Sequence, residues 1–525
     1  MSRQVDRRVA SPPVVLGLLV AAAAGCTEVE PVPEPLPAPP QCAPTAGGPY
    51  RVIEGEPVSF TVTCATPGEQ RAGDRFVLPD LPAGASYDPA TATVTWTPGF
   101  DQAAVRALTL AVDGELISGR VTLAIADAFD TPGNVPPRDP TTYTEELGLP
   151  VLFISPAPRS QSYEPVTVVY RGQTFAAEAM QRGASSISYP QLSYTIKFAD
   201  GQPFVDPHQA GGFFGKRKIV AITTFDDNSY VRQRLAYELW RRMDPGHMDV
   251  QAYSAVMYVD GAFHGLYTIA DHVDDDFFED RGLDENGNVF KSVTHDANFD
   301  LVSASGAPKG SNLHLGWEKK DGLPLEGQPG AFADLDALTT FVATSSAATF
   351  AAELPTRIDV RDFQDWFVFA TYTLAEDSAG KNAYLYHDPL AGPWRFVPWD
   401  LNHSFGQAWQ TYRTGATQWN DFRGRNKIFA RMMDDPALGP ALAARYRALL
   451  DGPLAEDAVL ALFDDMAAEV APVAVRNQRK WGTPYRTFGR WSARTDFTDH
   501  AAELVYTRAW IRSRHAMLRA RYPAR

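Results

Sequence analysis

The first region with a regular pattern of apolar and polar residues lies between about residues 47 and 126. In its short segments apolar and polar side chains alternate with a period of two, which is typical of β-strands that bury one face. The residues on the apolar face are Val58, Phe60, Val62 and Cys64; Val94 and Trp96; and Val121, Leu123 and Ile125. Pro-Gly, Ala-Gly and Asp-Gly turns separate these segments. The region therefore predicts a small all-β sandwich.

From about residue 148 to the end, helical and strand patterns are mixed. The expected strands are residues 193–198 and 218–223, followed by a hairpin, 253–259 and 263–269, around the favoured turn dipeptide Asp260-Gly261. The expected helices are residues 228–243, 360–374, 440–476 (two helices, broken near Gly452-Pro453) and 498–522. Asn228 is the expected N-cap of the first helix. These patterns predict one α+β domain over residues 148–525.

Stretches without periodicity flank the sandwich. Residues 26–46 are rich in Pro and Glu, which predicts a stiff, extended tether, and residues 127–147 contain a run rich in Pro and Asp, which predicts a linker. Before the tether, residues 1–25 combine a positively charged start with a short apolar run over 14–24. That run is shorter than the roughly 20 residues that span a bilayer, and the combination is typical of a signal peptide.

The end of this leader, Ala23-Ala24-Gly25-Cys26, resembles a bacterial lipobox. The resemblance implies cleavage before Cys26 and attachment of lipid to its sulfur, which would anchor the exported protein to a membrane. We therefore expect a lipoprotein of the outer membrane, the cell surface or the periplasm. Ordinary secretion, with cleavage at small residues, is the alternative.

Cysteine usage and charge narrow the class of protein further. Besides Cys26 the chain holds only Cys42 and Cys64, which could pair in an oxidising compartment; two free buried thiols are the alternative. No Cys-x-x-Cys or His-Glu-x-x-His pattern occurs, so the sequence does not support a zinc site. The net charge of −15 argues against nucleic acid as a partner.

The main candidate for chemistry is Asp377 with Asn382 five positions on, followed by a strand, a turn, a strand and Asp400. This is the polar skeleton of a phosphotransfer site. In protein kinases one Asp accepts the proton of the attacking hydroxyl, and an Asn and a second Asp hold the metal ions that bridge the phosphates. Structural roles are the alternative: Asp377 would cap a turn, Asn382 would satisfy loop backbone, and residues 398–400 would form a corner.

Several segments of the second domain together resemble the spore coat protein H (CotH) kinase family. They are Tyr194-Thr-Ile-Lys197-Phe, residues 232–242, Val259-Asp-Gly-Ala-Phe-His-Gly-Leu-Tyr267, Gly287-Asn-Val-Phe-Lys291, residues 377–386, and Pro398-Trp-Asp400 with Phe405-Gly406. They run in the family's order across residues 148–525. The resemblance implies an atypical two-lobed protein-kinase-like domain that uses ATP with Mg²⁺ or Mn²⁺ to phosphorylate Ser or Thr hydroxyls of a protein substrate.

Carried onto this sequence, the resemblance implies that Asp377 is the catalytic aspartate and that Asn382 and Asp400 bind the metal. The family's second acidic residue, two positions after Asp400, is Asn402 here. An Asn can coordinate Mg²⁺ through its carbonyl oxygen but contributes no charge. The principal metal ligand is therefore present, and the second metal site depends on Asn402.

The nucleotide-binding lysine of a kinase lies on a strand, within reach of a helix Glu. Lys197, in the Y-x-x-K-F strand, is the first choice, and Lys218 and Lys291 are its rivals. Glu238, on the helix over 228–243, is the expected ion-pair partner. For Lys197 and Lys218 the alternative is a solvated lysine of an edge strand.

Other polar residues near these motifs have weaker patterns. By the resemblance, Asp271 at the end of the hairpin is a candidate for a hinge or nucleotide contact. The acidic run over 271–280 lacks the EF-hand order and predicts a solvated helix start rather than a calcium site. His387 and His403 flank the main site, and as lone histidines they are expected to pack or to form hydrogen bonds.

Residues 81–98 resemble the immunoglobulin-like repeats of bacterial surface proteins, which implies a spacer or adhesion module for residues 47–126. The whole sequence thus predicts an exported, lipid-anchored atypical Ser/Thr kinase that carries an Ig-like spacer. The alternative is a catalytically weak kinase-fold surface protein that acts as an adhesin or as a scaffold for assembly, because a fold alone does not decide function.

Overall fold

The computed structural model describes residues 42–66, 71–99, 102, 104–126, 138–206, 213–390 and 392–523. The predicted signal peptide, Cys26, most of the tether and the first part of the linker lie outside the described residues. The chain forms two compact units. The smaller consists mainly of residues 57–96 and 105–124, and the larger mainly of residues 125–525.

The smaller unit is built from strands. They are β1 (Pro44–Thr45), β2 (Tyr50–Ile53), β3 (Val58–Thr61), β4 (Thr63–Cys64), β5 (Phe76–Val77), β6 (Ser86–Asp88), β7 (Thr93–Trp96), β8 (Ala104–Val112) and β9 (Ser118–Ala126). One sheet has the order β2–β9–β8–β5 and a second has the order β3–β7–β6. Tyr50 of β2 stacks on Phe60 of β3, with ring centroids 5.1 Å apart, so aromatic packing joins the two sheets. The predicted alternation is confirmed, since Val94, Trp96 and Leu123 are buried.

Cys42 and Cys64 form a disulfide in the smaller unit. The pairing of β1 with β4, in which Pro44 lies opposite Cys64, brings the two segments together. The sequence left open whether these cysteines pair or remain free thiols, and in the structure they are paired. A bridge between residues 22 positions apart stabilises the fold by about 3 kcal/mol, because it limits the freedom of the unfolded chain.

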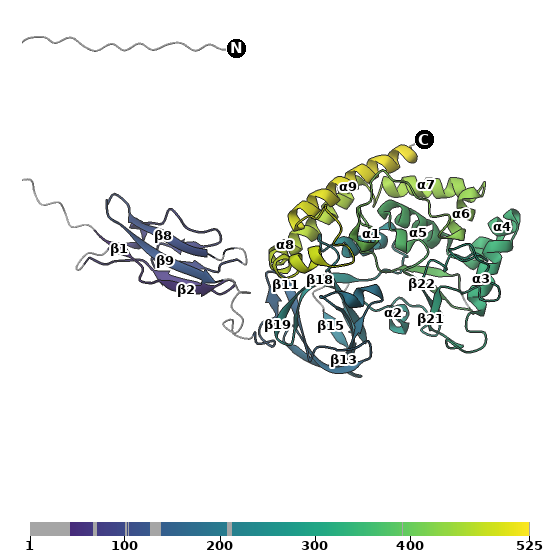
Figure 1. The fold of residues 1–525 in the computed structure, drawn as a ribbon, viewed down its shortest axis with the longest axis horizontal. Coiled ribbons are helices and arrows are strands. Elements are labelled where there is room, and N and C mark those ends of the chain that lie inside the picture. The colour runs from purple at the N-terminus through teal and green to yellow at the C-terminus, as the bar shows by residue number, and fades with distance from the viewer. Residues whose placement is uncertain are drawn as a thin grey trace, which may run out of the picture. The chain divides into compact units, whose positions relative to one another are not determined.

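The larger unit contains a closed β-barrel. Neighbouring strands follow the order β11–β12–β13–β14–β17–β19–β18, and β18 pairs in parallel with β11 to close the ring (Figure 1). These strands are β11 (Leu149–Ser155), β12 (Glu164–Tyr170), β13 (Gln173–Arg182), β14 (Ser193–Phe198), β17 (Lys218–Thr223), β18 (Ala252–Val259) and β19 (Ala262–Asp271). The hairpin of β15 (Phe204–Asp206) and β16 (Phe213–Lys216) adds Phe204 and Phe213 to the apolar core of the barrel. Inside the predicted linker, β10 (Glu145–Glu146) pairs with β11.

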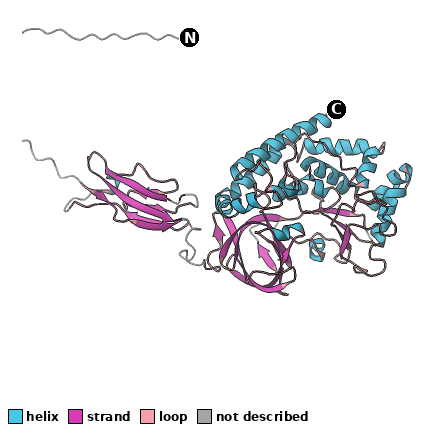
Figure 2. Ribbon diagram, viewed as in Figure 1, coloured by secondary structure: helices cyan, strands magenta, loops and turns pink. Residues whose placement is uncertain are grey.

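A second sheet and a helical layer complete the larger unit. The sheet has the order β21–β20–β22–β23, formed by β20 (Asn288–Ser292), β21 (Trp317–Asp321), β22 (Ala383–His387) and β23 (Arg395–Pro398). The helices are α1 (Arg232–Met243), α2 (Asp275–Glu279), α3 (Ala333–Thr344), α4 (Ala347–Arg357), α5 (Val360–Thr373), α6 (Lys427–Asp434), α7 (Leu438–Leu450), α8 (Glu456–Thr487) and α9 (His500–Arg521). Figure 2 shows the long helices on one side of this unit and most strands on the other. Within the described ranges, no helix combines the length and the apolar character needed to cross a membrane.

The elements predicted in the second domain are largely confirmed. The strands, the hairpin, α5 and α9 lie within a few residues of their expected bounds, and α7 and α8 are separated at Gly452-Pro453, although α8 continues past residue 476 to Thr487. The predicted N-cap of α1 is wrong. Asn228 instead donates its side-chain N–H to the carbonyl oxygen of Thr498 at 2.9 Å. Asp227 accepts the backbone N–H of Arg232 at 3.0 Å, and its negative charge is favourable at the positive start of a helix.

Arg232 ties α1 to α9 through a buried ionic network. Its guanidinium is fully buried, lies 2.5 Å from Asp227 Oδ1 and 2.5 Å from Glu503 Oε1, and donates to Thr507 Oγ1 at 2.9 Å. Burial alone would raise the pKa of Glu503, but Arg232 and Arg413 outweigh it and hold that pKa far below its usual range. Glu503 therefore stays charged in a place where water cannot solvate it.

We expect Arg232→Met to destabilise the larger unit by about 3–5 kcal/mol, because the methionine leaves Asp227 buried without its cation and leaves Glu503 with Arg413 alone. Arg241→Met is the matched control on the same helix. The side chain of Arg241 is 53% exposed in its ion pair with Glu238, and its loss should cost less than about 1 kcal/mol. Scanning calorimetry of the full chain measures both variants. Equal losses of stability in the two variants would contradict the role given to the Arg232 network.

Candidate active site

A cavity of about 680 Å³ lies in the larger unit between the barrel and the second sheet. Its walls come from β13, β14 and β17 of the barrel, from β20, β21 and β22 of the second sheet, and from residues that follow β23. The proposed catalytic aspartate and all three proposed metal ligands line it together: Asp377, Asn382, Asp400 and Asn402. The structure thus brings the segment at 377–382 and the segment at 400–402 to one cavity, hereafter the cleft.

The hairpin of β22 and β23 places two of these residues at the same end of the second sheet. Ala383 pairs with Pro398, so Asn382, just before β22, and Asp400, just after β23, leave the sheet side by side. Both have left-handed backbone, with φ of 54° and 59°. Asn and Asp tolerate this conformation better than other side chains with a Cβ atom. Backbone of this kind concentrates at functional sites, where the surrounding structure holds it in place.

Asp377 lies in a short 3₁₀ turn, Glu376–Ser378, just after α5. Trp366 of α5 fixes this turn by donating its indole N–H to the carbonyl oxygen of Ser378 at 2.8 Å. The carboxylate of Asp377 faces three basic side chains: His295 Nε2 at 3.3 Å, Lys381 Nζ at 3.5 Å and His403 Nδ1 at 3.7 Å.

These neighbours decide the charge of Asp377. Burial alone would raise the pKa of its carboxyl, but hydrogen bonds from His295 and His403 and the charge of Lys381 outweigh burial and hold the pKa well below its usual range. Asp377 is therefore an ionised carboxylate that lines the cleft. Such a group can orient a hydroxyl and accept its proton.

Asp226 and His403 also belong to the cleft, and neither was assigned to it from the sequence. Asp226 Oδ2 accepts hydrogen bonds from Asn402 Nδ2 at 2.7 Å and from the hydroxyl of Tyr189 at 3.0 Å. His403 lies between two carboxylates, with Nε2 3.5 Å from Asp226 and Nδ1 3.7 Å from Asp377. Burial alone would lower the pKa of His403, but the carboxylates around it outweigh burial and raise that pKa to about 9.

His403 was expected to pack or to form hydrogen bonds, and the structure adds a charge to that role, because the residue is an imidazolium that bridges two acidic residues of the cleft at neutral pH. The sequence signal that could have identified Asp226 is its position between a predicted strand and a predicted helix, where two adjacent Asp residues follow a buried strand.

His387 behaves as expected for a structural histidine. It stacks on Trp394 with centroids 4.3 Å apart, and its Nδ1 lies 2.8 Å from Asp334.

Two of the three candidate lysines line the cleft. Lys218 Nζ forms an ion pair with Asp274 Oδ2 at 2.9 Å, which compensates its charge. Lys291 has no ion-pair partner within the described residues, and its Nζ lies 5.6 Å from the centre of the Tyr384 ring. Burial and the charge of Arg182 lower the pKa of Lys291 to about 8, although Asp400 acts in the opposite direction.

The first choice, Lys197, and its expected partner Glu238 are corrected by the structure, because neither lines the cleft. Lys197 is at the end of β14, where its side chain is 45% exposed and lies 3.7 Å from Glu178 on the neighbouring strand. Glu238 points away from the buried side of α1 and pairs with Arg241 and Arg242 one turn further along the same helix. The helix residue that lines the cleft is Gln233.

With this geometry in view, comparison with known proteins identifies the family. The profile of the family described as CotH kinase protein matches residues 179–518, which is more than half of the chain and includes most residues of the cleft. The chain belongs to the CotH kinase family. It is similar to the inner spore coat protein H of Bacillus subtilis (strain 168), with 26% identity over 254 residues that cover 48% of this chain and 65% of that protein. The match thus spans slightly less than two thirds of that relative's length.

For a member of the CotH family, the residues of the cleft fit a hard divalent cation. They offer the Asp400 carboxylate and the side-chain amides of Asn382 and Asn402, all of them oxygen donors of the kind that Mg²⁺ and Mn²⁺ prefer. Asn402 Oδ1 is buried and has no hydrogen-bond partner among the described residues. An orphaned acceptor of this kind is costly unless something binds it. One carboxylate with neutral oxygens suits a cation that keeps phosphate and water ligands.

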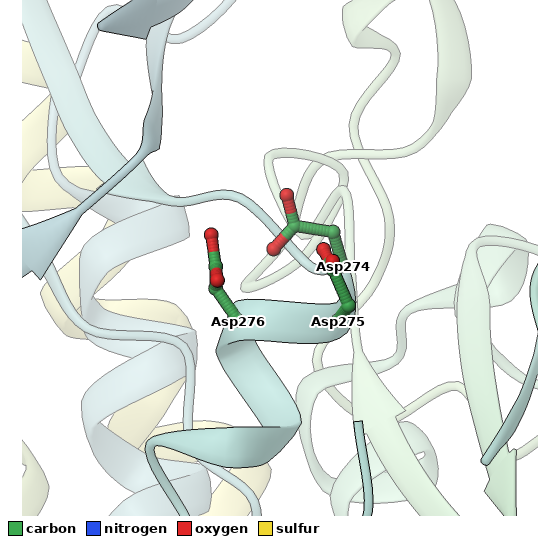
Figure 3. Close-up of side chains that lie close together, drawn as sticks. All are labelled: Asp274, Asp275 and Asp276. Atoms are coloured by element: carbon green, nitrogen blue, oxygen red, sulfur yellow. The ribbon is translucent and has the colours of Figure 1, made fainter. Parts of the chain in front are cut away.

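A second acidic group lies at the start of α2, where Figure 3 shows the carboxylates of Asp274, Asp275 and Asp276 close together. These carboxylates are paired with basic residues of β17 and the residue before it. Lys218 binds Asp274, and Arg217 binds both Asp275, at 3.0 Å, and Asp276. The sequence predicted that this acidic run would be solvated. In the structure its carboxylates form ion pairs instead.

Asp271, the candidate for a hinge or nucleotide contact, has a structural role in the barrel. It is buried, lies 3.2 Å from Lys216 Nζ, and accepts a hydrogen bond from Arg281 Nη2 at 3.1 Å. Its carboxylate also accepts the backbone N–H of Gln251 at 3.1 Å. These partners fix the end of β19, and Asp271 is not among the residues that line the cleft.

Proposed function

We propose that the larger unit is a metal-dependent kinase that transfers the γ-phosphoryl group of ATP to a Ser or Thr hydroxyl of a protein substrate. The observation that carries this proposal is the meeting, in one cleft, of an ionised aspartate, a set of oxygen donors for a cation, and a half-buried lysine that has no carboxylate partner in the part of the chain that the structure describes. The placement of the cleft between a barrel and a helix-covered sheet supports the two-lobed organisation expected of kinases.

The polar residues of the cleft divide the reaction into proton transfer, phosphate binding and cation binding. Asp377 accepts the proton of the acceptor hydroxyl. At the same time the hydroxyl oxygen bonds to the γ-phosphorus, and the bond from that phosphorus to the β,γ-bridging oxygen breaks, which releases ADP. Lys291 holds the phosphates by its charge, and Lys218 lines the same cleft. Asp400 and Asn382 would hold Mg²⁺ or Mn²⁺, which when bound neutralises negative charge on the phosphates. Most of the rate enhancement would come from positioning and charge neutralisation.

We further propose that the protein acts outside the cytoplasm. The Cys42–Cys64 disulfide supports an oxidising compartment, and the name of the B. subtilis relative supports a place on a cell or spore surface. The signal peptide over residues 1–25 and lipid on Cys26 would provide export and membrane attachment. Digestion of the native protein with a lipase and mass spectrometry of its N-terminal peptide would test the lipid.

The function is tested by incubating the purified full chain with γ-labelled ATP, Mn²⁺ and casein as a generic Ser/Thr acceptor. We expect label on Ser or Thr of the acceptor or of the chain itself, and none when EDTA removes the cation. A folded protein that binds neither Mn²⁺ nor ATP would contradict the proposal and favour the alternative role as a binding scaffold.

Lys291 predicts how nucleotide affinity depends on pH. Because the pKa of Lys291 is about 8 in the free protein, the lysine loses its positive charge as the pH rises through that value. Affinity for ATP should therefore be constant below about pH 8 and fall by up to about tenfold per pH unit above it. Calorimetric titration between about pH 7 and 10 measures this.

Lys291→Met should bind ATP weakly with no such fall, whereas the matched control Lys197→Met, on the exposed end of β14, should behave like the wild type. A Lys291→Met variant with wild-type affinity and an unchanged pH profile would show that another group holds the phosphates.

A further inference from the structure

Asn402 is held in one orientation by Asp226. The amide of Asn402 donates through Nδ2 to Asp226 Oδ2 at 2.7 Å, while its Oδ1 is buried with no partner among the residues that the structure describes. A carboxylate can only accept hydrogen bonds. The amide must therefore turn its nitrogen toward Asp226, which leaves its carbonyl oxygen directed to the other side.

Asp226 is itself fixed by its surroundings. Only 3% of Asp226 is exposed, its Oδ2 accepts the hydroxyl of Tyr189 at 3.0 Å, and its backbone carbonyl accepts Gln407 Nε2 at 2.8 Å. Tyr189 in turn packs between aromatic rings, with Phe225 5.3 Å and Trp491 5.6 Å away. The loop between β17 and α1 thus holds the carboxylate rigidly behind Asn402.

We propose that Asp226 is a positioning residue that presents Asn402 Oδ1 to the cation of the cleft. This inference rests on the proposed kinase function, since it assigns one ligand of the same cation. Outer partners orient metal ligands in the same way in other proteins.

The test compares affinities for a non-hydrolysable ATP analogue, measured by calorimetry with saturating Mn²⁺ and again in EDTA. The ratio of the two affinities reports the contribution of the cation. Asp226→Ala should lower this ratio about tenfold and leave the affinity in EDTA unchanged. Asp226→Asn, which keeps an oxygen to accept Asn402 Nδ2, should stay within about threefold of the wild type.

The double variant separates positioning from general damage. If Asp226 acts through Asn402, Asp226→Ala combined with Asn402→Ala should be no worse than Asn402→Ala alone. Asp334→Ala is the matched control. Asp334, like Asp226, has an Asn and a His as partners, here Asn288 at 2.8 Å and His387 at 2.8 Å. Asp334 lies on α3 and does not line the cleft, so Asp334→Ala should leave the ratio unchanged.

Three results would overturn the role of Asp226: a wild-type ratio in Asp226→Ala, a tenfold loss in Asp226→Asn, or losses that multiply in the double variant. Because the Asn variant keeps the shape of the side chain, a tenfold loss in it counts against the role even where the Ala variant does not fold. A wild-type protein whose affinity does not respond to Mn²⁺ would refute the proposed function as well. If the wild type does respond, and the fold-losses of the two single variants multiply in the double variant, only the role of Asp226 is refuted.

Discussion

Asp377→Asn is expected to lower the turnover number for phosphoryl transfer by about 10²–10⁴-fold. The asparagine has nearly the same shape but cannot accept a proton from the attacking hydroxyl. In the wild type, His295, Lys381 and His403 keep Asp377 ionised in spite of burial, so the base is ready at neutral pH. Binding of ATP and Mn²⁺ should change little, because Asp377 is assigned to the acceptor and not to the nucleotide. Rates under saturating ATP and Mn²⁺ measure the effect.

Asp388→Asn is the matched control for this substitution. Asp388 lies in the turn between β22 and β23, where Oδ1 accepts the backbone N–H of Leu390 at 2.8 Å. Its loss should leave the rate within about twofold, as for surface substitutions away from special features. If Asp377→Asn kept a wild-type rate, Asp377 would be a structural residue of the 3₁₀ turn and the assignment of the base would be wrong.

Asp400→Asn should have an effect of similar size for a different reason. The substitution removes the one negative charge among the proposed cation ligands, and loss of charge stabilisation worth about 4 kcal/mol lowers kcat/KM by about 10³-fold. Unlike Asp377→Asn, this variant should also lose most of the increase in ATP affinity that Mn²⁺ provides. The two aspartates are thus distinguished by measuring rate and Mn²⁺-dependent binding on the same preparations.

Partial recovery of the Asp400→Asn rate at high Mn²⁺ would agree with a weakened cation site. A full wild-type rate at ordinary Mn²⁺ concentration would contradict the role of Asp400. So would a loss of rate with unchanged Mn²⁺-dependent binding, since Asp400 would then act on the chemistry without holding the cation.

The sequence was most informative where the relevant geometry is local. Asn382 and Asp400 are joined by one hairpin, so the spacing of a strand, a turn and a second strand was enough to predict that they lie together, and the structure places them there. The alternation of the smaller unit and the periodicity of α5 are likewise local patterns. In these places propensity, turn chemistry and burial all favour the same structure.

The residues that the sequence misassigned or missed depend on contacts between distant segments. Lys197 and Lys218 lie opposite each other on β14 and β17, and only Lys218 lines the cleft, which the strand patterns alone do not show. Asp226 is 176 positions away from Asn402, to which it is hydrogen-bonded, and no local pattern connects them. His403 resembles a lone histidine until the fold places Asp226 and Asp377 on either side of its ring.

The most direct test of the proposed site is a crystal structure of the protein with Mn²⁺ and a non-hydrolysable ATP analogue, with anomalous data that locate the manganese. We expect a manganese peak bound by Asp400 and Asn382, with phosphates beside Lys291 and the terminal phosphate facing Asp377. Manganese and nucleotide bound elsewhere, with this cleft containing only water, would contradict the assignment of the cleft as a phosphotransfer site.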